Sequence, residues 1–134
     1  MQEKKEVSLL SIRILRILLS GIFIAAGINH IKAPESIAER TAITPLGAYL
    51  EPIGLEFLGI ASGVLMLLAG IAFLIGFYTR YAAWILCILL IPITIIIQTN
   101  GGLMHGPFWK NIAILGGLLF FMLNPPLDNN KINL

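Results

Sequence analysis

The chain has 134 residues, of which 57% are hydrophobic and 12% are charged, and its mean hydropathy is +0.90. Because water-soluble domains carry about 25% charged residues, this composition excludes a soluble globular protein. The formal net charge of +2 is too small to indicate a nucleic-acid-binding surface. The single cysteine, Cys87, excludes a disulfide within the chain and a Cys-x-x-Cys motif for dithiol chemistry.

Four apolar segments follow one another along the chain, and each has a length that can cross a bilayer as a helix. They span about residues 9–30, 53–77, 81–98 and 108–123. None alternates apolar and polar residues as barrel strands do, and helices satisfy their own backbone hydrogen bonds in lipid. The sequence therefore predicts an all-α fold, an integral membrane four-helix bundle over residues 1–124, followed by a short polar tail over residues 125–134.

The connections between these segments differ in length and composition. The longest covers residues 31–52, and its stretch "PESIAER", which begins at Pro34, predicts a short surface helix. A glycine-rich loop over residues 98–106 joins the third segment to the fourth. Pro92 lies inside the third segment and predicts a kink there.

The basic residues predict how the bundle lies in the membrane. One side of a four-pass chain holds six of them: Lys4, Lys5, Arg13, Arg16, Arg80 and Lys131. The other side holds three: Lys32, Arg40 and Lys110. Since the side richer in Lys and Arg is usually cytoplasmic, we expect both termini in the cytoplasm and a multi-pass protein of the cell membrane.

Helical spacing places small and polar residues on one stripe of each segment, which is the expected interior of a membrane bundle. The first stripe runs through Arg13, Arg16, Ser20, Phe23, Gly27 and His30, and the third through Arg80, Trp84, Cys87, Ile91, Thr94 and Gln98. The second contains Glu56, Gly59, Gly63 and Gly70, and the fourth Lys110, Ala113, Gly117, Phe120 and Asn124. Because small residues let helices approach closely, we expect Gly59, Gly63 and Gly117 to be helix-packing residues.

At the predicted outer end each stripe contributes one polar side chain, and these four converge: His30, Glu56, Gln98 and Lys110. One interpretation is structural, with an ion pair between Glu56 and Lys110, because an unpaired charge in hydrocarbon is costly. The other makes the four residues a ligand-binding pocket open to the outer face, since an ionisable group in a spanning helix is a functional hypothesis by default. The sequence leaves both interpretations open.

No motif identifies a catalytic residue or a metal site. His30 and His105, together with a glutamate, have the chemistry to bind zinc or iron, but their spacing matches no ligand motif. The only aspartate, Asp128, lies in the tail, which argues against a Ser/His/Asp triad. We therefore expect no bound metal.

Four stretches of the chain carry a resemblance to a known family: "RILLSGIFIAAGINHIKAP", "LEFLGIASGVLMLLAG", "TRYAAW" and "GPFWKNIAILGGLLFF". In this order and spacing, from about Arg13 to Phe121, they resemble the DoxX family of small four-helix membrane proteins. The resemblance implies a bundle in a cytoplasmic membrane, often bacterial. The family includes a subunit associated with a terminal quinol oxidase and relatives linked to thiosulfate oxidation with quinone as acceptor. Other relatives are thought to serve in redox complexes or as membrane chaperones.

The resemblance also bears on single residues. Glu56 matches the family's acidic residue before a glycine-rich second helix, and residues 27–30 match its exit from the first helix. Thiol-active members of the family carry paired cysteines, whereas this chain has one. Thiol–disulfide chemistry is therefore not expected of this chain alone.

The sequence and the family resemblance together suggest two functions of different classes. The first is a subunit of a quinone-linked membrane oxidoreductase, in which His30 and Glu56 hydrogen-bond or protonate a quinone. A partner would supply the electrons, since the sequence has no haem-ligand pair, flavin motif or iron–sulfur cysteines. The alternative is a non-enzymatic assembly factor, chaperone or scaffold for another membrane protein. A small-molecule carrier is disfavoured, because the chain shows no inverted repeat.

The predicted partners are the lipid bilayer and a membrane or redox protein, with no nucleic acid, and a homo-oligomer is left open. Quinone is the one cofactor that the resemblance implies, and no cofactor is expected to be covalently bound.

Overall fold

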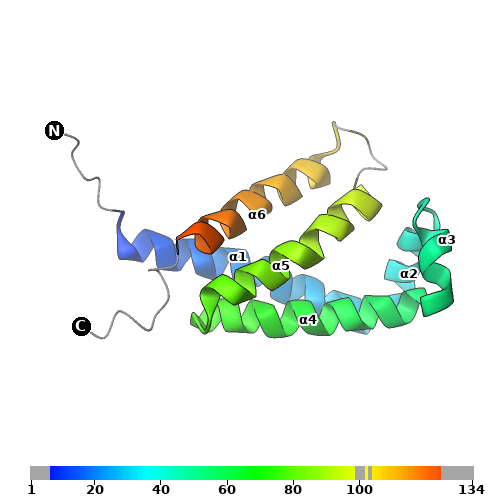
Figure 1. Ribbon diagram of the computed structural model, residues 1–134, viewed down its shortest axis with the longest axis horizontal. Helices are drawn as coiled ribbons and strands as arrows, with labels where there is room; N and C mark the ends of the chain where they lie inside the picture. Colours follow the sequence, from blue (N-terminus) through cyan, green and yellow to red (C-terminus); the bar gives the residue numbers. More distant parts are fainter. Residues whose placement is uncertain (1–6, 99–101, 103, 125–134) are drawn as a thin grey trace.

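The computed structural model describes residues 7–98, 102 and 104–124, and within these residues the chain forms helices and no strand (Figure 1). The helices are, in order, α1 (Leu9–Lys32), α2 (Pro34–Ala42), α3 (Gly47–Leu50), η1 (Glu51–Ile53), α4 (Leu55–Ile75), α5 (Thr79–Ile93), η2 (Thr94–Gln98) and α6 (Gly106–Leu123). η1 is a 3₁₀-helix and η2 a π-helix. The tail over residues 125–134 lies outside the described residues.

Four helices, α1, α4, α5 and α6, are long and apolar enough to cross a membrane. The prediction of an all-α four-helix membrane bundle is therefore confirmed. With η2 counted as part of α5, every spanning helix begins and ends within two residues of its expected bounds. Large apolar side chains such as Leu68, Ile88 and Leu119 are exposed on the outside of the bundle. Such a surface suits contact with lipid chains, because apolar side chains lose nothing by facing hydrocarbon.

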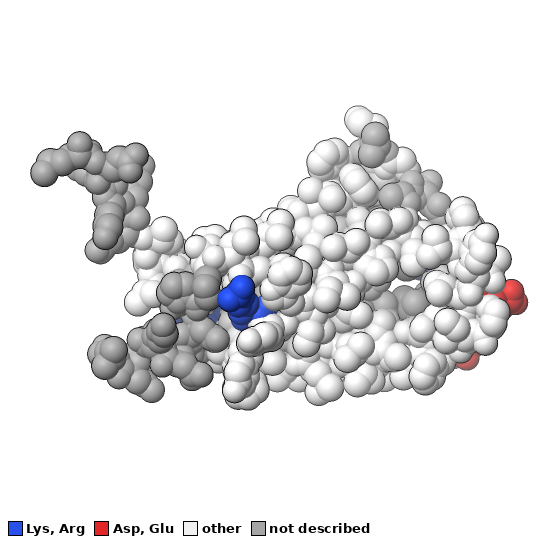
Figure 2. Space-filling view, in the orientation of Figure 1, with Lys and Arg blue, Asp and Glu red and all other residues white. Residues whose placement is uncertain are grey.

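The first and the last spanning helix share one end of the bundle. α1 begins and α6 ends at one end of the bundle, whereas α2 and α3 lie at the opposite end, which we call the mouth (Figure 1). Acidic side chains appear at the mouth on the face that Figure 2 shows. The described basic residues divide evenly between the two ends, with Arg13, Arg16 and Arg80 at one and Lys32, Arg40 and Lys110 at the other. The predicted asymmetry then rests on Lys4, Lys5 and Lys131, outside the described residues, so the sidedness stays a prediction.

A tight turn joins α4 to α5. Gly76 adopts a left-handed conformation with φ 80°, which a glycine takes without steric cost. The Phe77 N–H donates to the Ala72 carbonyl at 2.8 Å, and the Gly76 N–H donates to the Phe73 carbonyl at 3.3 Å. These two bonds form a Schellman motif, which satisfies the last carbonyls of α4 and turns the chain back into the membrane.

The core lies between α1, α4, α5 and α6. Phe73, Leu86 and Leu118 are fully buried, and the Phe73 ring meets the Phe121 ring edge-on at 5.0 Å. The geometry is the one that aromatic pairs prefer. Phe23 adds a buried side chain from α1, so the core draws one face from each of the four spanning helices.

The face of α6 that packs inward differs from the predicted one. The buried residues are Asn111, Ile114, Leu118, Phe121 and Met122, whereas Ala113 and Asn124 are exposed. The predicted stripe of the fourth helix was wrong by one position, which is a rotation of about 100° in a helix of 3.6 residues per turn. Because α6 is apolar on nearly all sides, periodicity did not distinguish its inward face. On α5, Trp84 and Ile91 are likewise exposed rather than inward-facing.

The mouth is covered by α2. Pro34 occupies the first turn of this helix, where its missing N–H is not needed, so the predicted surface helix is confirmed. α2 packs against α4 near Gly59, where an added Cβ atom would lie 3.5 Å from the Ile37 Cβ. This packing brings Arg40 of α2 over the end of the bundle.

Candidate functional site

His30, in the last turn of α1, is the central residue of the mouth. Its side chain is only 8% exposed. The ring nitrogen Nδ1 lies 2.9 Å from Ser62 Oγ of α4. Gly63 makes room for this contact, because an added Cβ atom there would lie 2.8 Å from the His30 Cβ. His30, one of the four residues of the predicted cluster, therefore faces the bundle interior and is hydrogen-bonded to a neighbouring helix.

The hydrogen-bond network determines which ring nitrogen carries the proton. Ser62 Oγ donates to the Gly59 carbonyl at 2.9 Å. Since a hydroxyl has one hydrogen, its oxygen must accept from the His30 Nδ1–H. A neutral imidazole then presents Nε2 as a proton acceptor. The Gly59 carbonyl, which accepts from Ser62, is also a hydrogen-bond partner of the His30 ring. With Nδ1–H directed at Ser62 and Gly59, Nε2 is the nitrogen that a ligand can reach.

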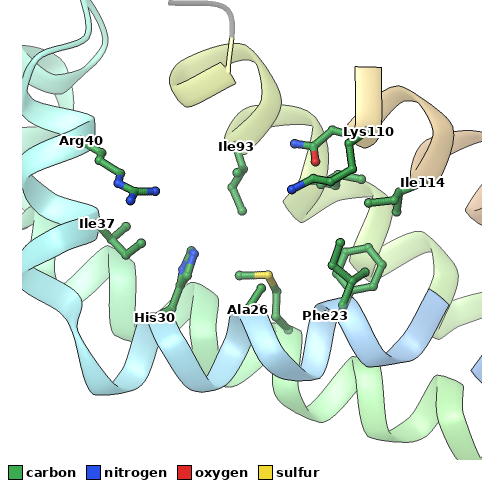
Figure 3. A pocket seen from close by; sticks show the side chains of 12 residues that line it. Phe23, Ala26, His30, Ile37, Arg40, Ile93, Lys110 and Ile114 are labelled. Atoms are coloured by element: carbon green, nitrogen blue, oxygen red, sulfur yellow. The ribbon is translucent and has the colours of Figure 1, made fainter. Parts of the chain in front are cut away.

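A first cavity of about 150 Å³ lies between α1, α2, α5 and α6 (Figure 3). Its polar lining residues are His30, Arg40, Lys110 and Asn111, and its apolar ones are Ile22, Phe23, Ala26, Ile37, Met66, Leu90, Ile93 and Ile114. We call it the cationic chamber. Arg40, Lys110 and His30 extend into it from three different helices (Figure 3). None of the residues found in its lining is acidic.

A second cavity of about 420 Å³ lies between the α2–α3 segment, α4 and α5, and we call it the apolar groove. Its polar lining residues are His30, Thr41 and Ser62, and its apolar ones are Ile37, Leu46, Leu50, Leu55, Leu58, Gly59, Ile88, Leu89, Pro92, Ile93 and Ile96. The volume falls in the range of about 300–1,000 Å³ typical of small-molecule sites. A mostly aliphatic lining with a few polar groups is also typical of such sites.

His30 joins the two cavities. It lines both of them, together with Ile37 and Ile93. The groove suits an apolar molecule, whereas the chamber carries positive charge at its opening. A proton acceptor between the two can therefore act on a polar group of a ligand whose apolar part lies in the groove.

Asn111, which lines the chamber, takes part in a pair of buried hydrogen bonds. Asn111 Nδ2 donates to Thr94 Oγ1 at 3.0 Å, and Thr94 Oγ1 donates to the Leu90 carbonyl at 2.7 Å. Both side chains are buried. Pro92 lacks the N–H that would continue α5, and the chain changes to the π-helix η2 two residues later. These hydrogen bonds therefore hold α6 against η2, at the point where the regular helix of α5 ends.

The structure brings together only part of the predicted cluster. His30 and Lys110 both line the cationic chamber. Gln98 is the last residue of η2, and its side chain lies outside the described part of the chain. Glu56 is exposed and lines neither cavity. The expectation that it points into the bundle was wrong, because in the first turn of α4 the carboxylate stays at the surface, where hydration stabilises its charge.

The ion pair predicted between Glu56 and Lys110 is not formed in the structure, and neither residue has a further ionic partner among the described residues. His105 precedes α6 and lines neither cavity. Among the described residues no three His, Cys, Asp or Glu side chains gather where they could hold a metal ion.

The three glycines expected to pack helices lie at helix contacts. Gly59 faces α2, and Gly63 faces α1. Gly117 faces α1 as well, because an added Cβ atom there would lie 2.7 Å from the Leu19 Cδ1. Gly63 and Gly117 therefore let two helices come closer than a larger residue would allow, whereas a Cβ atom at Gly59 would make only ordinary contacts with α2.

Three residues of the site were absent from the predicted cluster: Arg40, Ser62 and Asn111. Ser62 and Asn111 had a signal in the sequence, since each is a polar residue inside a spanning segment, where such groups usually bond to another helix. No such signal marked Arg40, because it lies on a short separate helix, and the sequence does not indicate where that helix docks.

The fold and the two cavities define a small four-helix membrane protein with a ligand-sized site at one end of the bundle. A family model described as DoxX matches residues 11–99, which is more than half of the chain. The chain belongs to the DoxX family. The matched part runs from α1 to η2 and holds His30, Arg40 and Ser62. No curated protein and no solved structure matches the chain.

Proposed function

We propose that this DoxX-family protein is a subunit of a quinone-linked membrane oxidoreductase, and that it holds the quinone in the apolar groove with the headgroup against His30. The observation that carries the proposal is the composition of the groove. Its lining is aliphatic except for His30, Ser62 and Thr41, and His30 and Ser62 are hydrogen-bonded to each other.

The residues of the groove fit a quinone in its reduced form. The apolar lining suits the hydrocarbon tail. Thr41 Oγ1 donates its hydrogen to the Ile37 carbonyl at 2.8 Å, so it offers lone pairs to a ligand, as His30 Nε2 does. Two acceptors match the hydroxyl groups of a quinol better than the carbonyl groups of a quinone. When bound, such a cofactor supplies redox chemistry that transfers two electrons and two protons.

His30 would take the proton that leaves the headgroup hydroxyl. Its Nδ1–H donates to Ser62, which orients the ring and stabilises the imidazolium that forms when Nε2 is protonated. We assign the electron transfer to a partner subunit, since the side chains around the groove are aliphatic, hydroxyl and imidazole groups.

The test is ligand binding by the full chain in lipid nanodiscs, measured with decylubiquinone and its quinol and corrected for partition into protein-free discs. Leu58→Trp fills the groove from α4 and should abolish binding. Leu68→Trp is the matched control, because Leu68 lies on the same helix, is exposed and lines neither cavity.

His30→Ala should weaken quinol binding roughly tenfold, as expected when one hydrogen bond of about 1–1.5 kcal/mol is lost, and should affect the quinone less. Equal binding by the wild type, Leu58→Trp and Leu68→Trp would show that the groove is not the site.

One observation favours the second function, a scaffold for another membrane protein. Gly21 on α1 and Gly116 on α6 are exposed, and an added Cβ atom at either would meet nothing within 4 Å. Small residues on a lipid-facing surface allow a helix of another protein to approach closely. If Gly21→Leu and Gly116→Leu abolish the co-purification of a partner while decylubiquinol binds neither these variants nor the wild type, the scaffold would be the better proposal.

A further inference from the structure

Two basic side chains extend toward each other across the opening of the cationic chamber (Figure 3). Arg40 comes from α2 and Lys110 from α6. His30 and Asn111 complete the polar part of the lining, and no acidic residue is found in it. Among the described residues, no carboxylate pairs with Arg40 or Lys110. The opening therefore carries positive charge that no acidic side chain among the described residues neutralises.

The rest of the chamber is apolar. Phe23, Met66, Leu90 and Ile114 contribute buried side chains from α1, α4, α5 and α6. α1 packs far more extensively against α4 than against α6. The chamber thus lies between two spanning helices that pack only lightly on each other, and it runs from a charged opening to an apolar floor.

The charged opening and the apolar floor together suit an amphiphilic ligand. Cations at the edge of hydrocarbon are costly unless they are paired, so the opening favours an anion. A phosphate group matches it, because Arg can donate two parallel hydrogen bonds and Lys adds a compact charge. The floor favours an apolar chain. The molecule that carries both and surrounds every spanning helix is a phospholipid.

We infer that the cationic chamber binds the polar end of an anionic phospholipid, with the phosphate between Arg40 and Lys110 and only the first few methylene groups of one acyl chain against the apolar floor, as the volume of about 150 Å³ allows. The lipid fills the gap between α1 and α6 and neutralises the opening. Arg40, Lys110 and Asn111 line the chamber but not the groove. The inference therefore does not rest on the proposed quinone function.

The test is lipid retention. The full chain is incorporated into nanodiscs made from an equimolar mixture of phosphatidylcholine and phosphatidylglycerol, extracted in mild detergent, and its bound lipids are counted by native mass spectrometry. The wild type should retain phosphatidylglycerol selectively. Arg40→Gln combined with Lys110→Gln should lower this retention roughly tenfold, because two charge-assisted contacts to phosphate are lost.

Two controls separate binding from folding. Lys32→Gln removes a nearby exposed cation that lines neither cavity, and it should retain the lipid as the wild type does. Arg40→Lys combined with Lys110→Arg keeps both charges and should restore most of the retention even if the neutral double variant folds poorly. Retention that is equal in all four proteins would overturn the inference.

A competition experiment distinguishes a bound lipid from a free anion. Inorganic phosphate added at high concentration should displace little of the bound lipid, because it cannot cover the apolar floor. Complete displacement would overturn the assignment to a lipid. Leu58→Trp, at a position that lines the groove and not the chamber, should lose decylubiquinol and still retain phosphatidylglycerol, so a failed quinone site and a failed lipid site give different results.

Discussion

Gly27 of α1 and Gly63 of α4 lie against each other where these two helices cross, so closely that neither position has room for a side chain. A Cβ atom on Gly27 would lie 2.8 Å from the Gly63 carbonyl oxygen, and one on Gly63 would lie 2.9 Å from the Gly27 carbonyl oxygen. In a bilayer, close packing of this kind is a main source of attraction between helices. The same crossing sets His30 beside Ser62, so the packing of the bundle and the geometry of the site depend on one contact.

Gly63→Ala should destabilise the protein by about 1–3 kcal/mol, the usual cost of forcing extra atoms into a packed contact. The free energy of unfolding can be followed by circular dichroism during denaturation with sodium dodecyl sulfate. Gly116→Ala is the matched control, because a Cβ atom there meets nothing within 4 Å. It should leave the stability unchanged or raise it by up to about 1 kcal/mol, as Ala favours the helix. Equal losses in the two variants would contradict the packing role.

The sequence predicted this packing in part. The spacing of Gly59 and Gly63 marked the side of α4 that meets another helix, and the stripe of α1 contained Gly27. The partner of each glycine could not be predicted, because helical periodicity describes one helix at a time. On α6, where nearly every face is apolar, the buried side was misjudged by one position. Asn111 is the buried residue, while Lys110 reaches the chamber from an exposed position.

Ser62→Ala should change the protonation pattern of His30. In the wild type, Ser62 Oγ accepts a hydrogen bond from the His30 Nδ1–H, which favours the tautomer in which Nε2 carries no hydrogen. Without Ser62 Oγ the ring keeps only the Gly59 carbonyl as an acceptor. The preference for this tautomer should weaken, and the ¹⁵N chemical shifts of the imidazole should move toward averaged values. The chain has two histidines, so a His105→Gln background leaves His30 as the only source of the signal. Ser11→Ala, at an exposed site near the start of α1, should leave the shifts unchanged.

Glu56→Gln tests the correction made to the predicted cluster. Because Glu56 is exposed and lines neither cavity, its neutralisation should alter decylubiquinol affinity by no more than about twofold, the usual size of a surface effect. The measurement is the same nanodisc titration that serves for His30→Ala. A tenfold loss in Glu56→Gln would show that the carboxylate reaches the ligand and would restore the residue to the site.

The site shows where prediction from the sequence stopped. His30 was found because it continues a stripe of small and polar residues along one long helix. The chamber and the groove could not be found, since both need α2 to fold back over the mouth and bring Arg40, Ile37 and Thr41 against other helices. Glu56 was misplaced because one polar residue at the start of a helix fits a stripe almost as well as it fits the surface.

Asn111 and Thr94 should be energetically coupled. Thr94→Val removes the acceptor of the Asn111 amide in a buried place and should cost about 0.5–2 kcal/mol, the range for polar contacts between spanning helices. Asn111→Leu should cost a similar amount. The double variant should lose less than the sum of the two, because no buried amide is then left unpaired. Additive losses in this double-mutant cycle would contradict the coupling.

Labelling of introduced cysteines would test the predicted sidedness of the membrane protein. Cys87 is buried, so the unmodified chain should react little with a membrane-impermeant maleimide. Glu39→Cys places a thiol on an exposed position of α2 at the mouth, and Phe77→Cys places one on the exposed turn at the opposite end. If the termini are cytoplasmic, intact cells should label Glu39→Cys at once and Phe77→Cys only after permeabilisation. The reverse pattern would mean that the mouth, with both cavities, opens to the cytoplasm, and that the six basic residues assigned to the inner side do not set the orientation.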